Sequence, residues 1–384
     1  MSNIIRIIEK IMADKGESPL FSFRSFLFVV SKVYGGAVKL REKFYQKGVF
    51  QSKRLPCMVI SVGNLTVGGT GKTPMTIYVA NLVKDLGYRV AVISRGYKGS
   101  AEKKGGIVSD GQTLFTGPET AGDEPYMMAA ILKDVPVIVG KNRFEAGMLA
   151  VREFDPDVFV LDDAFQHLKL MRDIELVLLD YRYPFGNRHL LPRGPLREPI
   201  SSLSRADAFI LTRSELSESM SLERIETIAD ERPVIRSFYV PYVCQVVKGN
   251  TSRYHSMFQN SFTDDLKSLK SLNVFAFSGL AKNQNFRQTF EVLKCNVVGF
   301  LGFSDHHRYS DQDLEKIVNS AKQLGADAFV TTEKDYVKIA LGINWPMDLI
   351  VIGIKIGFEE EDAFVNFIKS QLGGLKKKKE VVES

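Results

Sequence analysis

The residues best suited to chemistry occur in a glycine-rich run, Gly68-Gly69-Thr70-Gly71-Lys72-Thr73, between an apolar segment and a segment with helical spacing. In this context the backbone N–H groups and the helix N-terminus can bind the phosphates of a nucleotide. Lys72 is expected to reach the β- and γ-phosphates of ATP, and the Thr73 hydroxyl to ligate Mg²⁺. Thr66 stands where the GxxxxGK[ST] pattern has its first glycine, so the loop is a variant, and a glycine-rich turn without a nucleotide is the alternative. The predicted nucleotide-binding residues are Thr66, Val67, Gly68, Gly69, Thr70, Gly71, Lys72 and Thr73.

Two adjacent carboxylates, Asp162 and Asp163, follow the apolar run that begins at Val158. An apolar strand ending in acids suits the magnesium-holding strand of a phosphate-loop enzyme, because ligands gather at the carboxyl ends of parallel strands. Thr73, Asp162 and Asp163 are therefore the predicted metal ligands. A strand that ends in a structural Asp is the alternative.

Two further positions are candidates for acid–base chemistry. Asp123 precedes an apolar helix, where it is either a helix N-cap or the base that a hydroxyl acceptor needs. His306 and His307 are adjacent, and they either take part in the chemistry or lie on an ordinary loop, because no further Cys or His spacing supports a metal site.

The segment Gly186–Pro199 is rich in Gly, Pro and Arg and is too patterned for a plain connection. Arg193 and Arg197 are predicted to bind an anionic substrate, since guanidinium groups form paired hydrogen bonds with phosphate. A solvated basic loop is the alternative.

Alternating strand-like and helix-like segments predict parallel sheets with helices on both faces. The expected fold class is α/β: a P-loop NTPase-like α/β/α sandwich, a second, smaller α/β domain and an N-terminal amphipathic, membrane-associating helix. The predicted domains are an amphipathic and basic arm (1–55), a P-loop domain (56–235), a linker (236–272), a second α/β domain (273–372) and a basic disordered tail (373–384).

Composition narrows the function classes. The net charge of +6 is too small to indicate nucleic-acid binding, and three scattered cysteines indicate neither a disulfide framework nor a zinc site. The segment Leu20–Val38 is interrupted by Arg24 and Lys32, so it is not expected to span a bilayer, which needs about 20 mostly apolar residues. Its aromatic residues and the basic stretch after it favour a helix lying at a membrane surface, and a helix packed on the protein core is the alternative.

The ordered set of motifs resembles the tetraacyldisaccharide 4′-kinases of lipid A synthesis. The resemblance covers nearly the whole chain. Its departures are Ala164, where that family commonly has Gly, and Arg193, where it has Ala. The matching motifs are SVGNLTVGGTGKTP (61–74), SRGY (94–97), GDEP (122–125), DDAFQHLKLMRD (162–173), LLPRGPLREP (190–199), FSGLAKNQNF (277–286), FSDHH (303–307) and TTEKD (331–335).

The resemblance implies a monotopic enzyme on the cytoplasmic face of a bacterial inner membrane. With ATP and Mg²⁺ it would phosphorylate the 4′-hydroxyl of a tetraacylated glucosamine disaccharide 1-phosphate, giving lipid IVA. The resemblance also implies that Asp123 acts as the base together with His306, and that Lys72 assists catalysis. The alternative function is a P-loop NTPase switch or assembly factor without a lipid acceptor, which would hydrolyse nucleotide without making a phospholipid.

Overall fold

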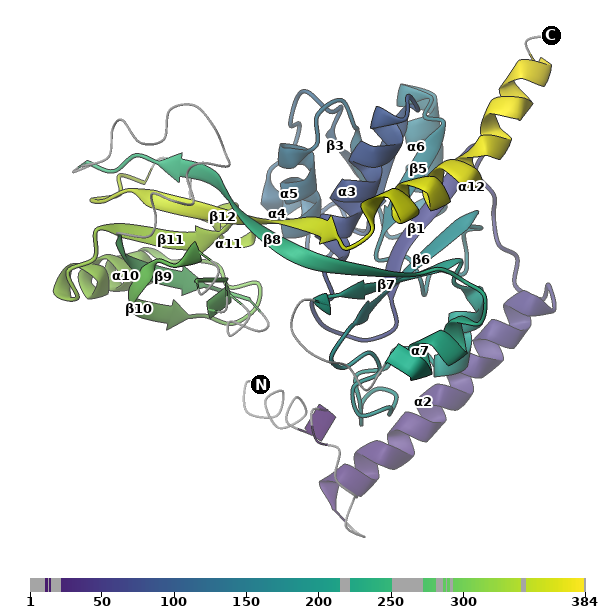
Figure 1. The fold of residues 1–384 in the computed structure, drawn as a ribbon, viewed down its shortest axis with the longest axis horizontal. Helices are drawn as coiled ribbons and strands as arrows, with labels where there is room; N and C mark the ends of the chain where they lie inside the picture. The colour runs from purple at the N-terminus through teal and green to yellow at the C-terminus, as the bar shows by residue number, and fades with distance from the viewer. Residues whose placement is uncertain are drawn as a thin grey trace.

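The computed structural model describes residues 11–12, 14, 22–214, 222–250, 272–280, 286–287, 289–290, 293–339 and 343–382. Its strands form one twelve-stranded sheet in the order β10-β9-β11-β12-β8-β7-β6-β1-β5-β2-β4-β3 (Figure 1). The sheet runs through two α/β domains that lie side by side, so the predicted fold class is confirmed.

The first domain contains one half of the sheet. Its strands pair in parallel except β3, which is antiparallel to β4. They are almost entirely buried, because helices cover both faces of a parallel sheet. The strands are β1 (Met58–Asn64), β2 (Val90–Ser94), β3 (Gly106–Ser109), β4 (Val137–Val139), β5 (Val158–Asp162), β6 (Ile174–Asp180) and β7 (Ala208–Thr212).

Helices close both faces of this domain. One face packs against α3 (Lys72–Asp85), α5 (Asp123–Ile131) and α12 (Glu361–Val382), and α4 (Pro118–Ala121) precedes α5. The opposite face packs against α6 (Arg143–Phe154), η1 (Ile200–Arg205) and α7 (Leu222–Ala229).

Helix α12 corrects the predicted boundary of the second domain. Phe364, Ile368 and Leu372 are buried in the core of the first domain, although the sequence prediction placed them in the second. The reason is topological: β12 runs antiparallel to β8 and carries the chain back to the first domain. The helix also continues to Val382, so the prediction of a disordered tail from residue 373 is wrong up to that residue. Lysine is a good helix former, and the basic run extends the helix.

The second domain contains β9 (Asn273–Ser278), β10 (Asn296–Gly302), β11 (Ala328–Thr332) and β12 (Leu349–Phe358), with α10 (Asp311–Gln323) and α11 (Glu333–Tyr336). Strands β10, β9, β11 and β12 are parallel neighbours. Side chains on both sheet faces are buried in two separate clusters, which makes this domain a smaller α/β sandwich.

Strand β8 (Val234–Val247) joins the two domains. It pairs in parallel with β7 at its start and antiparallel with β12 along most of its length. The prediction of a linker from residue 236 is therefore wrong for 236–247, and residues 251–271 of that linker lie outside the described part. The alternation of strands and helices weakens in this part of the sequence, which is why its extended stretch is predicted as a linker.

Helix α2 (Phe23–Gln46) lies along the edge of the first domain (Figure 1). Its buried side includes Leu27, Ser31 and Gly35, and a Cβ on Gly35 would contact the side chain of Leu190. An apolar stripe on the same helix faces outward and is 52–70% exposed: Phe26, Val29, Val33 and Leu40. Within the described ranges, no helix combines the length and apolarity needed to cross a bilayer.

Candidate active site

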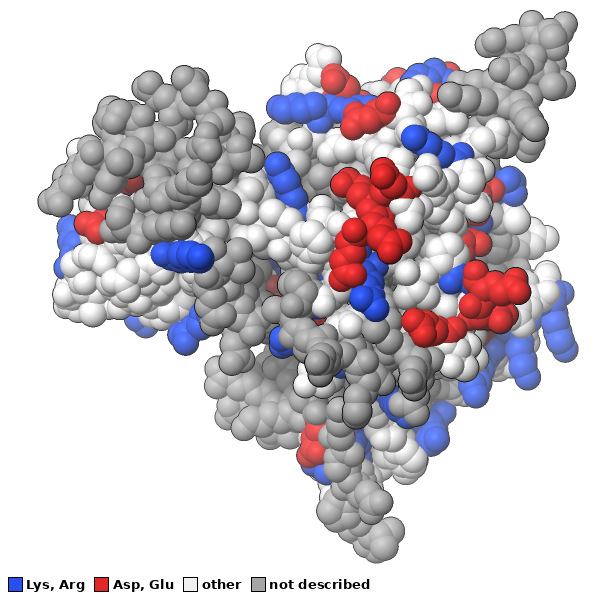
Figure 2. Space-filling model, in the orientation of Figure 1, with Lys and Arg blue, Asp and Glu red and all other residues white. Residues whose placement is uncertain are grey.

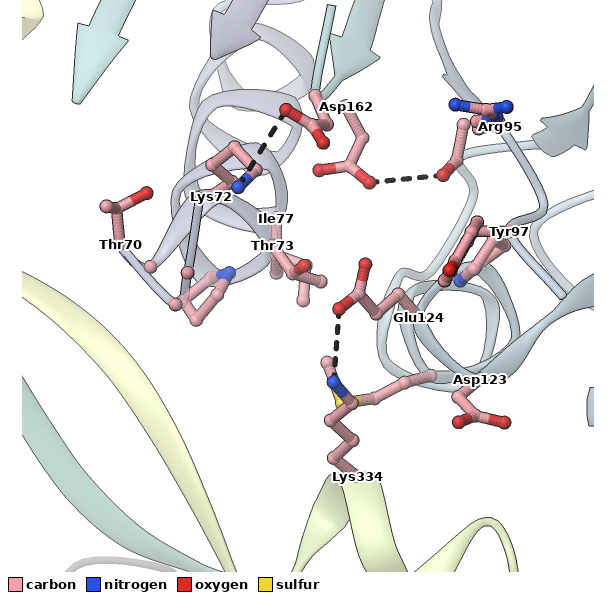
Figure 3. Close-up of a pocket in the computed structure, with 18 of the residues that line it drawn as sticks. Thr70, Lys72, Thr73, Ile77, Arg95, Tyr97, Asp123, Glu124, Asp162 and Lys334 are labelled. Carbon is pink, nitrogen blue, oxygen red and sulfur yellow. Dashed lines mark hydrogen bonds and ion pairs between the residues drawn. The ribbon is translucent and has the colours of Figure 1, made fainter. Parts of the chain in front are cut away.

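A cavity of about 1630 Å³ lies between the two domains. In Figure 3, residues of α3 and the loop before it lie on one side, and Lys334 of the second domain approaches from another. Asp162, Asp123 and Glu124 complete the part of the cavity shown there. The cavity therefore brings together the candidate residues of both domains.

The phosphate loop has the backbone that its sequence predicts. Gly71 has φ +78° at the N-cap of α3, and a Cβ at this position would collide with the Tyr239 hydroxyl. The Asn64 side chain donates to the Thr70 hydroxyl at 2.7 Å, and the Arg213 guanidinium donates to the Gly69 carbonyl oxygen at 2.8 Å. Both contacts fix the loop before a nucleotide arrives. Seven of the eight predicted nucleotide residues line the cavity, from Val67 to Thr73, and Thr66 instead forms a β-bridge with Leu196.

Asp162 lies at the carboxyl end of β5, as predicted. Its two carboxylate oxygens accept hydrogen bonds from the Thr76 hydroxyl at 3.3 Å and the Ser94 hydroxyl at 3.1 Å. Burial, followed by the charges of Glu124 and Asp163, raises the pKa of Asp162 to about 7. Such a carboxylate is stabilised by a cation placed beside it.

Asp163 has different surroundings from Asp162. Its Oδ1 atom lies 2.9 Å from Arg197 Nη1 and 3.8 Å from Lys72 Nζ. Burial alone would raise the pKa of Asp163, but Lys72 and Arg197 lower it overall. Asp163 is thus a charge partner that holds Lys72 in the phosphate loop.

Asp123 and His306 meet across the domain boundary. Asp123 begins α5, and His306 comes from the loop after β10; His306 Nδ1 lies 2.9 Å from Asp123 Oδ2. Burial by itself would raise the pKa of Asp123, but the hydrogen bond from His306 and the charges of Lys338 and Lys334 lower it overall. Asp123 is therefore ionised at neutral pH and able to accept a proton.

A second polar link joins the domains beside this pair. Lys334 Nζ lies 3.3 Å from Glu124 Oε1 of the first domain and 3.3 Å from Asp305 Oδ1 of the second. Burial opposes the charge of Lys334, but the two carboxylates raise its pKa overall. Figure 3 shows Lys334 pointing toward Glu124, next to Asp123.

The comparisons with known proteins agree on one family. The family model described as tetraacyldisaccharide-1-P 4′-kinase matches residues 23–373. A curated tetraacyldisaccharide 4′-kinase from Desulfatibacillum aliphaticivorans is 40% identical over 378 residues, covering 97% of this chain and 99% of that protein. One from Syntrophus aciditrophicus is 40% identical over 364 residues, covering 92% and 94%. A solved structure, the "apo" form of LpxK from Aquifex aeolicus in complex with ATP, is 36% identical with a TM-score of 0.71 and covers 91% and 99%.

The chain belongs to the tetraacyldisaccharide-1-P 4′-kinase family. It is a kinase of lipid A biosynthesis. The comparisons support this function and not the alternative of a P-loop switch.

Within this kinase, the two arginines predicted to bind substrate have different positions. Arg193 is buried, and its guanidinium donates to the Ile11 carbonyl oxygen at 2.9 Å; it does not line the cavity. Arg197 lines the cavity but is held by Asp163, Asn64 and Gln166. Arg193 thus packs the loop against the N-terminal segment, and Arg197 holds Asp163 in position. The reason is local: the chain from 186 to 199 folds on itself and against residues near the N-terminus.

Several cavity residues of the kinase were not identified from the sequence. Tyr97 makes an edge-to-face contact with His306, with ring centroids 5.9 Å apart. Lys334 belongs to TTEKD and Tyr97 to SRGY, so the motifs contained the signal without indicating a role. His307 is turned to Asp313, with Nε2 3.0 Å from Oδ2, and does not line the cavity.

Proposed function

We propose that this chain transfers the γ-phosphate of ATP to the 4′-hydroxyl of a tetraacylated glucosamine disaccharide 1-phosphate, giving lipid IVA, with Asp123 as the base. The observation that carries the proposal is the 2.9 Å contact between Asp123 and His306 in a cavity that also contains the phosphate loop. An ionised carboxylate facing a phosphate-binding loop suits proton removal from an acceptor hydroxyl.

The phosphate loop supplies most of the stabilisation in this proposal. Its backbone N–H groups and Lys72 balance the charge of the phosphate oxygens, which is the main requirement of phosphoryl transfer. Asp163 and Arg197 keep Lys72 in place, so little reorganisation accompanies the reaction.

The residues present fit Mg²⁺ as the metal of the ATP complex. Thr73 and Asp162 supply oxygen ligands, which Mg²⁺ prefers, and Asp162 is a buried carboxylate that a cation would stabilise. Among the described residues, no group of three or more His, Cys, Asp or Glu could hold a metal alone. This agrees with a metal bound partly by substrate phosphates. Asp162 is assigned as the direct ligand, and Asp163 supports the site from its ion pairs. When bound, Mg²⁺ would neutralise charge on the phosphates.

Asp123 accepts the proton of the acceptor hydroxyl as the new P–O bond forms. His306 donates from Nδ1 to the Asp123 carboxylate, which orients it and stabilises its charge. Tyr97 packs against the His306 ring and limits its rotation. Because the two halves of this pair come from different domains, the base is complete only when the domains are in contact.

The protein is proposed to sit peripherally on the cytoplasmic face of the bacterial inner membrane through α2. The outward stripe of α2 is apolar, and exposed lysines at positions 32, 39, 43 and 47 flank it. Figure 2 shows Lys and Arg side chains along the edge that α2 occupies in Figure 1. Apolar burial and attraction to anionic lipids act together at such a helix.

The decisive test of the activity uses ATP, Mg²⁺ and tetraacyldisaccharide 1-phosphate in detergent micelles, with the product followed by mass. Lys72→Ala should abolish product formation, whereas Lys84→Ala, on the same helix, should leave it near the wild-type level. Acceptor-independent ATP hydrolysis without a phospholipid product would refute the proposal.

The membrane assignment is tested separately by sedimentation with vesicles containing anionic phospholipid. Val29→Glu combined with Val33→Glu should release the protein into the supernatant. Met171→Glu, which changes an exposed apolar residue in another part of the chain, should not. Equal sedimentation of both variants would exclude α2 as the contact.

A further inference from the structure

The acceptor carries a phosphate that must be recognised away from the reacting hydroxyl. Five cations of the cavity are already neutralised by carboxylates within 4.0 Å: Lys72, Arg95, Arg197, Arg213 and Lys334. Of the other cavity cations in the described part of the chain, none has a carboxylate within this distance: Arg41, Lys103, Lys141, Arg143 and Lys169. Arg143 is buried and is acted on by the charges of Asp162 and Asp163, so the other members of this second group are the cations open to an anionic ligand.

Two members of the second group, Arg41 and Lys169, come from separate elements on either side of His167: Arg41 contacts the residue before this histidine, and Lys169 lies two residues after it. Arg41 comes from α2, and its guanidinium donates to the Gln166 carbonyl oxygen at 2.8 Å. Lys169 lies three residues after Gln166, and its side chain is exposed. Arg41 thus retains further N–H donors, and Lys169 its whole ammonium group, for a ligand.

His167 lies next to Gln166, the residue that Arg41 contacts, and also lines the cavity. Its Nε2 atom is buried and has no hydrogen-bond partner among the described residues, although the ring lines the cavity. Burial, followed by four positively charged neighbours, lowers the pKa of His167 to about 3, so the ring is neutral. Those neighbours are Arg143, Arg172, Arg41 and Lys169. An anion here would meet several cations, of which Arg172 is already paired with Glu175.

We infer that Arg41 and Lys169, together with the ring of His167, bind the 1-phosphate of the acceptor. The inference rests on the proposed function and adds a substrate subsite to it. Guanidinium and ammonium groups are the preferred partners of a phosphate monoester, and a buried polar nitrogen without a partner is stabilised when a ligand supplies one.

The acceptor needs two separate polar sites in the cavity. The 4′-hydroxyl and the 1-phosphate are at opposite ends of a disaccharide, so they must occupy different ends of one cavity. The charges that act on Asp123 are those of His306, Lys338 and Lys334, whereas Arg41 and Lys169 act on His167. Asp123 and His167 therefore have separate sets of charged neighbours.

The subsite also involves the helix that is proposed to contact the membrane. Arg41 directly follows Leu40, which belongs to the outward apolar stripe of α2. A lipid whose acyl chains remain in the bilayer would present its headgroup phosphate near this helix. Helix α2 thus serves both attachment and recognition of the acceptor.

The test compares two acceptors, tetraacyldisaccharide 1-phosphate and the same lipid with a 1-hydroxyl. Wild-type protein should favour the phosphorylated acceptor in kcat/KM by about 10- to 100-fold, the range for lost hydrogen bonds to a charged group. The Arg41→Ala/Lys169→Ala variant should lose this preference through a higher KM for the phosphorylated acceptor. Its kcat/KM for the 1-hydroxyl acceptor should stay within about twofold of wild type. Lys43→Ala, an exposed change on the same helix outside the cavity, should keep the preference.

Three results would overturn the inference. An unchanged preference in the double variant would exclude these residues, and an equal loss for both acceptors would show that they serve only the fold. If the 1-hydroxyl acceptor gives no product, an unchanged KM for the phosphorylated acceptor in the double variant would be equally negative. These results differ from failure of the proposed function itself, in which wild-type protein phosphorylates neither acceptor and both proposals fall.

Discussion

Asp123→Asn is the most informative single change, because it removes the base while keeping the size of the side chain. The asparagine carbonyl oxygen can still accept a hydrogen bond from His306, so the contact between the domains is largely retained. The lost property is the ability to take a proton. We expect turnover to fall while the KM for ATP stays near its wild-type value, since the phosphate loop is untouched.

The size of the effect follows from the surroundings of Asp123. General-base help contributes about 10²- to 10⁴-fold, or roughly 3 to 5 kcal/mol of barrier. Burial alone would raise the pKa of Asp123, but His306, Lys338 and Lys334 lower this pKa overall. Asp123 is therefore a weaker base than an ordinary carboxylate. Phosphoryl transfer also has a loose transition state with little need for proton removal. We therefore expect the lower half of the range, about 10²- to 10³-fold in kcat.

The pH dependence has a defined sign. The carboxylate is ionised above its lowered pKa, so its contribution is present at neutral pH and is lost only as the pH falls through that lowered pKa. Wild-type kcat should thus show no acid limb from Asp123 between pH 6 and 8. The same pair stabilises the fold above the ordinary pKa of a carboxyl group and loses this contribution as the pH falls through the lowered pKa of Asp123.

The assay is product formation at saturating ATP and acceptor, measured for Asp123→Asn, His306→Ala and the double variant. Because the two residues act as a unit, the double variant should lose less than the product of the single losses. Strictly multiplicative losses would show that the residues act independently. An acid limb between pH 6 and 7 that disappears in His306→Ala would assign the base role to His306.

Three further predictions follow from the site. Burial, followed by neighbouring carboxylates, raises the pKa of Asp162 from 3.8 to about 7, so the metal-free protein loses stability as the pH rises through that range. The stability of Asp162→Asn relative to wild type should therefore rise by about 2 to 3 kcal/mol between pH 5 and pH 8. A stability difference that does not change with pH in thermal unfolding would contradict this. Gly71→Ala should weaken ATP binding at least about tenfold by isothermal titration, because a positive φ costs roughly 1–2 kcal/mol and the Cβ has no room. Gly87→Ala, with similar φ but open space, should leave ATP affinity unchanged. Lys334→Met should lower kcat/KM about tenfold, because two partly exposed ion pairs of up to roughly 1 kcal/mol each are lost. The exposed control Lys322→Met should have no effect on kcat/KM. Equal kcat/KM values for the two variants would show that Lys334 does not contribute to the site.

Local features could be predicted from the sequence where one element determines the position of a residue. The phosphate loop lies between β1 and α3, and Asp162 ends β5, so parallel strands alone place them at one sheet edge. The contact of Asp123 with His306 spans 183 positions and two domains. No spacing rule fixes such a pair, and only the family resemblance indicated it.

The errors have physical causes. Arg193 looked like a substrate ligand because arginine suits phosphate, yet its guanidinium is used by backbone carbonyls of the N-terminal segment. Weak alternation around β8 led to its assignment as a linker, and the return of β12 to the first domain could not be determined from local patterns. Lys169 lies close to His167 in the sequence, but Arg41 reaches the neighbouring Gln166 across 125 positions, so no local pattern could indicate their proximity.

The antiparallel pair of β8 and β12 has a mechanical consequence. The two strands are paired from Ser237 to Val247 on one side and from Leu349 to Phe358 on the other. Any change in the angle between the two domains must therefore twist this ribbon of two hydrogen-bonded strands, because the domains are not joined by a flexible linker at this point. Because twisting weakens the hydrogen bonds of such a ribbon, the pairing favours one angle between the halves. The single irregularity in its pairing, between Val351 and Ile352, is where the ribbon can bend with the least loss of pairing.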